Sequence, residues 1–107
     1  MPIVSVIMPC FNSEKFIEAS IQSVLNQTFK NFELIIIDGG SSDNTKKIIN
    51  KLALTDNRLS LLENLEDQGP AHARYKGINK SKGIYVAFLD ADDLWLNNKL
   101  YLQINFM

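Results

Sequence analysis

The segment Asp90-Ala91-Asp92-Asp93 holds three aspartates in four residues and follows directly on an apolar stretch. In an extended backbone Asp90 and Asp92 point to the same side, so both carboxylates can approach one hard divalent cation, Mg²⁺ or Mn²⁺. Such a cation neutralises a diphosphate and stabilises it as a leaving group. An Asp-x-Asp spacing is short and common, however, and Asp92 or Asp93 could simply cap a following helix. By spacing alone, the two interpretations are equally supported.

Two further polar segments follow apolar stretches. The first covers residues 9–14 and includes Phe11, and the second covers residues 38–43 and contains two glycines and two serines. The glycines permit a tight turn beside a helix N-terminus, where a phosphate or a sugar hydroxyl could approach the backbone closely. By itself, the second segment is better explained as an ordinary strand-to-helix turn capped by Asp43.

Single residues elsewhere carry weaker signals. Arg74 could contact a phosphate or a carboxylate of the site, although a lone helical arginine is more often a solvated surface residue. His72 is the only histidine, which excludes a multi-histidine metal site. Cys10 is the only cysteine, which excludes an intrachain disulfide and a thiolate metal cluster. At the end of an apolar stretch, Cys10 is expected to be a small core or pocket-wall residue.

The polar segments need strands to position them, and four apolar stretches predict such strands. They cover residues 3–8, 32–37, 58–63 and 84–89, of which the third is the weakest and the fourth is a strong, buried strand. Pro9 is expected to end the first strand, because proline lacks the N–H group that a central strand must donate.

Helices are predicted between these strands. Ser13 would be the N-cap of the first, with Ile17, Ile21, Val24 and Leu25 on one apolar stripe. Ser42 or Asp43 would cap the second, with Ile48, Ile49 and Leu52 on its inner face. The third would run from Gly69-Pro70 to about Asn79, and the segment from Leu94 to Met107 is also expected to be helical.

The alternation of strands and helices is typical of an α/β fold with an open, mainly parallel sheet and helices on both faces. Ligands of such sheets bind beyond the carboxyl ends of the strands, where all three polar segments lie. No linker or internal repeat interrupts residues 1–107, so they are expected to form one domain, as part of a larger one.

Composition excludes several other classes. Hydrophobic residues make up 46% and charged residues 21%, which is ordinary for a globular protein. A formal net charge of −1 argues against a nucleic-acid binder. No P-loop pattern is present, and the first strand is not followed by G-x-G-x-x-G. No stretch is long enough to span a bilayer and no signal peptide begins the chain, so we expect a cytoplasmic location, with peripheral association at the inner face of the cell membrane left open.

Four blocks of sequence, in this order, resemble the inverting family 2 glycosyltransferases, which have the GT-A fold. They are VSVIMPCFNSE at residues 4–14, SVLNQT at residues 23–28, FELIIIDGGSSDNT at residues 32–45 and FLDADD at residues 88–93. Between the last two, GPAHAR at residues 69–74 resembles the family's G-x-x-x-A-R segment. The resemblance covers essentially the whole chain and is to the N-terminal, nucleotide-sugar-binding part of the family's domain.

The resemblance implies that several residues bind a nucleotide-sugar donor. Pro9, Phe11 and Glu14 would line the pocket for uracil, or another base, and for the ribose. Asp38 would hydrogen-bond the base, and Arg74 would lie near the nucleotide or its phosphates.

The resemblance also implies the reaction. Asp90 would face the ribose and the cation, and Asp92 would be the main direct ligand to Mn²⁺ or Mg²⁺. A sugar would pass, with inversion, from a UDP-sugar or a related donor to an acceptor hydroxyl of a glycan or lipid-linked glycan, in cell-surface polysaccharide or glycolipid synthesis. The general base is expected beyond Met107, so that this portion alone would be inactive.

Two residues depart from the family pattern. Gly39 stands where the family often has a second aspartate, and Tyr75 stands where it usually has an asparagine. Gly39 and the lack of a candidate general base within residues 1–107 leave a non-catalytic nucleotide-sugar-binding or regulatory module open as an alternative. A nucleotidyltransferase is less favoured, because it fits the Asp-x-Asp segment but not residues 9–14. An exposed sheet edge is also expected and would favour a homodimer.

Overall fold

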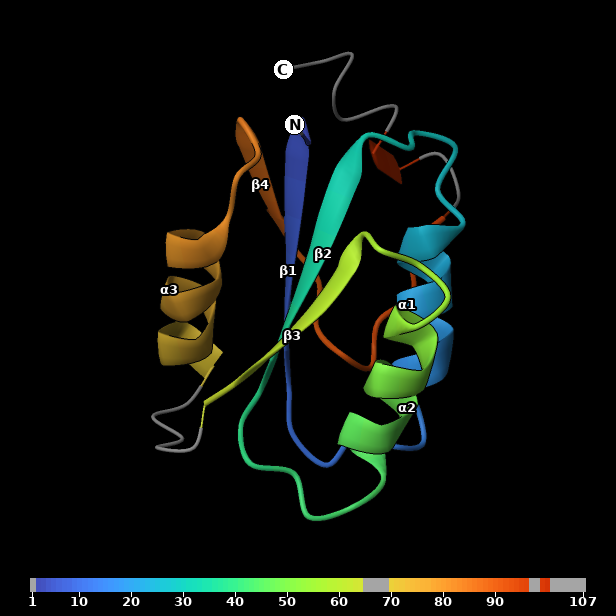
Figure 1. Ribbon diagram of the computed structural model, residues 1–107, viewed down its shortest axis with the longest axis vertical. Coiled ribbons are helices and arrows are strands. Elements are labelled where there is room, and N and C mark those ends of the chain that lie inside the picture. The colour runs from blue at the N-terminus through green and yellow to red at the C-terminus, as the bar shows by residue number, and fades with distance from the viewer. Residues whose placement is uncertain (1, 65–69, 97–98, 101–107) are drawn as a thin grey trace.

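The computed structural model describes residues 2–64, 70–96 and 99–100, and it contains the predicted alternation of strands and helices (Figure 1). The elements, in chain order, are β1 (Val4–Cys10), α1 (Ile17–Leu25), β2 (Phe32–Asp38), α2 (Thr45–Ala53), β3 (Leu59–Glu63), α3 (Pro70–Lys80) and β4 (Tyr85–Phe88). No helix in these described ranges is long and apolar enough to cross a membrane.

The four strands form one sheet in the order β3-β2-β1-β4, and every pair is parallel. Helices α1 and α2 cover one face of the sheet and α3 covers the other (Figure 1). This arrangement confirms the predicted open, parallel α/β sheet with helices on both faces. The chain winds from β1 outward to β3 and then returns to place β4 on the other side of β1, so the winding direction reverses between β1 and β4.

Both faces of the two central strands are buried. Alternate side chains of β1 and β2 pack against α1 and α2, and the others pack against α3. The larger core lies on the α1 and α2 side and includes all four residues of the predicted α1 stripe: Ile17, Ile21, Val24 and Leu25. The smaller core, on the α3 side, consists of Ile7, Ile35, Ile37 and Ala73 with Leu62 and Val86 at its margin.

Strand β1 continues through Pro9, so the prediction that this proline ends the strand is wrong. In a parallel sheet, the backbone groups of alternate residues point to the same neighbouring strand. The carbonyl oxygens of Ile3 and Ile7 point to the β4 side and accept hydrogen bonds of 2.9 and 3.1 Å from that side. The nitrogen of Pro9 points the same way, but the pairing with β4 ends at Ile7. The missing N–H therefore costs no hydrogen bond of the sheet.

The first two helices begin later than predicted. The carbonyl oxygen of Ser13 accepts hydrogen bonds from the N–H groups of Phe16 and Ile17, at 2.9 and 2.8 Å, so a turn precedes α1 and Ser13 is not its N-cap. At α2, the carboxylate of Asp43 accepts a 2.9 Å hydrogen bond from the backbone N–H of Thr45, the first helical residue. The N-cap of α2 is Asn44, so the prediction of Ser42 or Asp43 at that position is wrong, although Asp43 satisfies one donor at the start of the helix.

The fourth strand is less buried than its apolar sequence predicts. Strand β4 pairs only with β1 among the described residues, and Tyr85 and Phe88 are 37% and 45% exposed. The helix predicted from Leu94 to Met107 falls largely outside the described residues. Residues 94–96 are irregular, so neither Asp92 nor Asp93 caps a helix that begins directly after it.

Gly83 lies so close to β1 that a side chain there would collide with the backbone. A Cβ at this position would lie 2.6 Å from the backbone nitrogen of Ser5. We expect Gly83→Ala to lower the free energy of unfolding by about 1–3 kcal/mol, because a central strand cannot move aside. Chemical denaturation measures the change, with Lys82→Ala at the neighbouring exposed position as the control. Equal denaturation midpoints for the two variants would contradict this account.

Candidate functional site

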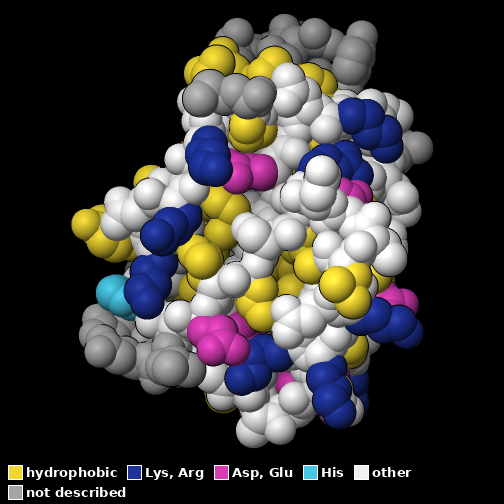
Figure 2. Space-filling view, in the orientation of Figure 1, with side chains coloured by type: hydrophobic (Ala, Val, Ile, Leu, Met, Phe, Trp, Pro, Cys, Tyr) yellow, Lys and Arg dark blue, Asp and Glu magenta, His cyan; other side chains and the backbone are white. Residues whose placement is uncertain are grey.

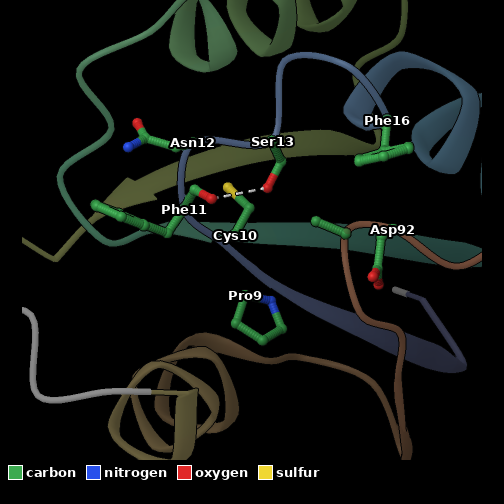
Figure 3. Close-up of a pocket in the computed structure, with 8 residues that line it drawn as sticks. Pro9, Cys10, Phe11, Asn12, Ser13, Phe16 and Asp92 are labelled. Carbon is green, nitrogen blue, oxygen red and sulfur yellow. Dashed lines mark hydrogen bonds between the residues drawn. The ribbon is translucent and has the colours of Figure 1, made fainter.

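An open cleft of about 310 Å³ lies at the carboxyl ends of β1 and β4. It is lined by the end of β1, the loop that follows it and the segment after β4: Pro9, Cys10, Phe11, Asn12, Ser13, Phe16, Ala91 and Asp92. Figure 3 shows Phe11 on one side and Asp92 on the other, with Pro9 and Cys10 between them. The cleft is thus at the reversal of strand order, where open α/β sheets bind their ligands.

Hydrogen bonds join the loop after β1 to the loop after β2. The Asn12 N–H donates to the hydroxyl of Ser41, and the Asn12 side-chain oxygen accepts from the N–H of Ser42, both at 2.8 Å. The N–H of Ser13 donates to the hydroxyl of Thr45, also at 2.8 Å. Asn12 has a φ of +46°, a left-handed conformation that asparagine tolerates better than most residues. The loop after β1, which lines the cleft, is therefore held in place by hydrogen bonds to the loop after β2 and to the first residue of α2.

Asp38 is fully buried, and its carboxylate is used within the protein. It accepts hydrogen bonds from the N–H groups of Gly40 and Ser41, at 3.2 and 2.9 Å, and from the hydroxyl of Ser41. The thiol of Cys10 lies 3.4 Å from the same carboxylate. Asp38 thus holds the turn after β2. It does not line the cleft, and its contact with a base stays a prediction.

Cys10 contributes a wall of the cleft. Burial raises the pKa of its thiol well above the ordinary value, and the negative charge of Asp38 raises that pKa further. A thiol that stays protonated is a poor nucleophile. Its location confirms the predicted pocket-wall role of Cys10.

Glu14 lies outside the cleft in the described structure. Its carboxylate accepts a hydrogen bond of 3.4 Å from the N–H of Asn44, and its own N–H donates to Asp43 at 3.2 Å. Glu14 therefore adds to the contacts between the two loops, and its role beside the base or ribose stays a prediction. Pro9 and Phe11 do line the cleft, and Phe11 is 56% exposed there.

The two aspartates of the Asp-x-Asp segment lie in different surroundings. The backbone is not extended there, because the N–H of Asp93 donates to the carbonyl of Asp90 at 3.0 Å and closes a turn. The argument that an extended backbone points both carboxylates to one side therefore does not hold. Asp90 forms an ion pair of 3.2 Å with Arg74, whose guanidinium also lies 6.0 Å from the ring centre of Phe88. Asp92 faces the cleft, and its carboxylate has no hydrogen-bond partner among the described residues.

The carboxylate at the cleft suits a hard cation whose other ligands are phosphate oxygens of a substrate. Within the described residues, no three His, Cys, Asp or Glu side chains gather closely enough to hold a metal ion by themselves. Mg²⁺, however, is commonly held by one or two carboxylates together with phosphates of the substrate. The exposed carboxylate of Asp92 fits that kind of partial site.

Sequence reasoning missed the residues that hold the cleft rather than line it. The hydroxyls of Ser41 and Thr45 accept hydrogen bonds from N–H groups of the loop after β1. The hydroxyl of Ser20 donates to the backbone of the segment after β4. Ser20 carries a signal that could have been read. It is a serine within the apolar stripe of α1, and a serine side chain is stable in such a buried position only when its hydroxyl has a hydrogen-bond partner.

The fold and the cleft define an open α/β ligand-binding domain, and comparison with known proteins identifies its family. The sequence matches glycosyl transferase family 2 over residues 5–107. The chain belongs to this family. The chain spans less than half the length of the curated relatives it matches, 43% of one and 41% of another.

Individual relatives and solved structures agree with this membership. The chain is 47% identical, over 98% of its length, to an Escherichia coli UDP-Glc:alpha-D-GlcNAc-diphosphoundecaprenol beta-1,3-glucosyltransferase, of which it covers 41%. It superposes on Staphylococcus aureus TarS in complex with UDP-GlcNAc with a TM-score of 0.85 at 33% identity, covering 97% of this chain and 30% of that one. A Pyrobaculum calidifontis mannosyltransferase in complex with GDP-Man and Mn²⁺ gives a TM-score of 0.81 at 32% identity, covering 88% of this chain and 28% of that one. The fold is the GT-A fold.

Asn12 tests whether the loop contacts hold the cleft. Asn12→Ala removes the acceptor for the N–H of Ser42 and places alanine at a positive φ, so we expect it to lower the free energy of unfolding by about 2 kcal/mol. Asn12→Gly removes the same acceptor but tolerates that backbone, and should cost roughly half as much. Chemical denaturation of both variants measures the difference. A glycine variant no more stable than the alanine variant would show that backbone strain is not involved.

Proposed function

We propose that this chain binds a nucleoside-diphosphate sugar, a UDP-sugar, together with Mn²⁺ or Mg²⁺ in the cleft between β1 and β4. The observation that carries the proposal is the meeting of Asp92 with the loop after β1 at the reversal of strand order. Support also comes from the GT-A neighbours, one in complex with UDP-GlcNAc and another with GDP-Man and Mn²⁺.

Residues that line the cleft and residues near it have different parts in this proposal. Phe11 and Pro9 supply the apolar walls against which the base and ribose lie. Asp92 holds the cation, and a bound cation supplies the positive charge that neutralises the leaving diphosphate. We propose that Arg74 contacts a phosphate and that Asp90 faces the ribose and the cation. Glu14 and Asp38 complete the base pocket through the loops that they hold together.

The reaction that we propose for the whole protein is sugar transfer with inversion. An oxygen of the acceptor hydroxyl bonds to the anomeric carbon, the bond from that carbon to the diphosphate breaks, and the hydroxyl proton passes to a general base. We place that base in the part of the protein after Met107. A glycan or lipid-linked glycan is the proposed acceptor, in cell-surface polysaccharide or glycolipid synthesis. We therefore propose a cytoplasmic enzyme, peripheral at the inner face of the membrane.

A non-catalytic nucleotide-sugar-binding module is a second candidate. It is favoured by Gly39, which stands where the family often has a second aspartate, and by the burial of the Asp38 carboxylate. Both candidates bind the donor, so turnover distinguishes them. Release of UDP from a UDP-sugar in the presence of an acceptor, by the protein that carries this chain, would exclude the module.

We further propose a homodimer formed at the edge where β4 lies. Apolar side chains are exposed there and on α3, with Tyr75 at 61%, Ile78 at 44% and Ile84 at 74%. On the face of the molecule that Figure 2 shows, apolar side chains lie between scattered charged ones. Light scattering should report a dimer that Ile84→Lys abolishes, because a charged side chain blocks pairing at a sheet edge. Leu54→Lys, at an exposed position of 88% after α2, should leave it intact. A monomer at every concentration would exclude the dimer.

Asp92 tests the proposed cation site directly. Isothermal titration with UDP should show tighter binding in the presence of Mn²⁺, and Asp92→Asn should remove most of that gain, with an affinity at least about tenfold lower. Asp93→Asn is the matched control, since it deletes the same charge one residue away at a position that does not line the cleft. Equal affinities for the wild type and both variants, with and without Mn²⁺, would contradict the assignment.

A further inference from the structure

Helix α1 and the turn that follows it carry a polar stripe, Ser20, Ser23 and Gln27, that is largely buried. Ser20 and Ser23 lie three residues apart on α1, and Gln27 follows two residues after the helix ends at Leu25. Ser20 and Gln27 are fully buried, although neither belongs to an apolar residue type. A buried polar side chain costs free energy unless it finds a hydrogen-bond partner. The partners of this stripe should therefore show what it is for.

All three side chains bond to the backbone of one segment, residues 91–100. The hydroxyl of Ser20 lies 2.6 Å from the carbonyl oxygen of Ala91 and 2.7 Å from that of Asp93, so one proton is shared between two acceptors. The hydroxyl of Ser23 accepts the N–H of Trp95 at 3.2 Å. The amide of Gln27 donates to the carbonyl of Leu96 at 2.6 Å and accepts the N–H of Leu100 at 3.0 Å.

The two acceptors of Ser20 lie on either side of Asp92. The peptide group before Asp92 and the peptide group after Asp93 are thus tied to α1, while the Asp92 side chain is exposed at the cleft. Apolar contacts already bury Ala91 and Trp95 of this segment. Such contacts have no preferred direction, whereas a hydrogen bond sets both distance and angle. The stripe therefore fixes the path of the backbone beyond what burial requires.

We propose that Ser20 is a positioning residue for the Asp92 carboxylate, which it holds ready for a divalent cation that arrives with a nucleoside diphosphate. The inference rests on the proposed function. Ser20 itself touches neither ligand and acts through the backbone on both sides of Asp92. Outer residues that orient a metal ligand typically change metal affinity by about 10-fold to 100-fold when they are removed.

The experiment measures free Mn²⁺ by electron paramagnetic resonance in titrations of the protein with Mn²⁺ and UDP, which needs no turnover. Ser20→Ala should weaken Mn²⁺ binding in the presence of UDP by about tenfold. Binding of UDP without metal should stay within about twofold of the wild type. This difference separates the positioning of a cation ligand from a general loss of structure.

Ser5→Ala is the matched control. Ser5 is also a fully buried serine, bonded to Glu33 at 2.6 Å and to the N–H of Gly83 at 2.8 Å, but it lies toward the other end of β1. This variant should lose thermal stability and leave Mn²⁺ affinity unchanged. If Ser20→Ala does not fold, Ser20→Cys replaces it, since a thiol occupies the same position but is only a weak donor to the carbonyls of Ala91 and Asp93.

The outcomes separate the two ideas. A wild-type protein whose UDP binding does not respond to Mn²⁺ would overturn the proposed function and this inference together. A wild type that responds, with Ser20→Ala or its replacement indistinguishable from Ser5→Ala in Mn²⁺ affinity, would overturn only the positioning role. A selective loss of Mn²⁺ affinity in the α1 variant would support both.

Discussion

The pairing of β1 with a parallel strand on each side determines where this protein can bind a ligand. Because β2 and β4 run in the same direction as β1, the carboxyl ends of these strands meet at one edge of the sheet. The chain winds away from β1 in one direction through β2 and returns on the other side through β4, which leaves a crevice between the two connections. Pro9 and Asp92, far apart in sequence, meet there for this reason.

Buried polar groups then give the cleft its shape. The side chains of Asp38, Ser20 and Gln27 are buried, and each forms hydrogen bonds with the backbone of a neighbouring loop in place of water. Loops at sheet edges are usually the most mobile parts of a fold. Here they are tied to β2 and α1, so the walls of the cleft are set before any ligand arrives. When the loops of a site are already ordered, less of the binding free energy is lost to ordering them.

The sequence predicted the fold well because burial on one or two faces leaves a periodic apolar pattern. It was wrong where the outcome depends on residues distant in sequence. Whether Pro9 ends a strand depends on how far β4 extends alongside it. The backbone of Ser13 is bonded to Thr45, and the turn at Asp92 is held by Ser20, so neither local conformation follows from local spacing. Pro9, Phe11 and Asp92 line the cleft at strand ends and were predicted, whereas Phe16 was not, and residues that support the cleft, such as Ser20 and Thr45, lie on α1 and α2.

The two carboxylates of the Asp-x-Asp segment are unequal partners for a cation. Asp92 is exposed at the cleft and has no hydrogen bond to give up among the described residues, whereas Asp90 is paired with Arg74. Both members of that pair are solvent-exposed, at 58% and 39% of their side-chain areas, and such pairs contribute at most about 1 kcal/mol. A diphosphate with its cation can therefore separate the pair at little cost. In the proposed function, Asp90 would then be free to face the cation and Arg74 free to face a phosphate, and the weak contact between them would be replaced by stronger ones to the ligand.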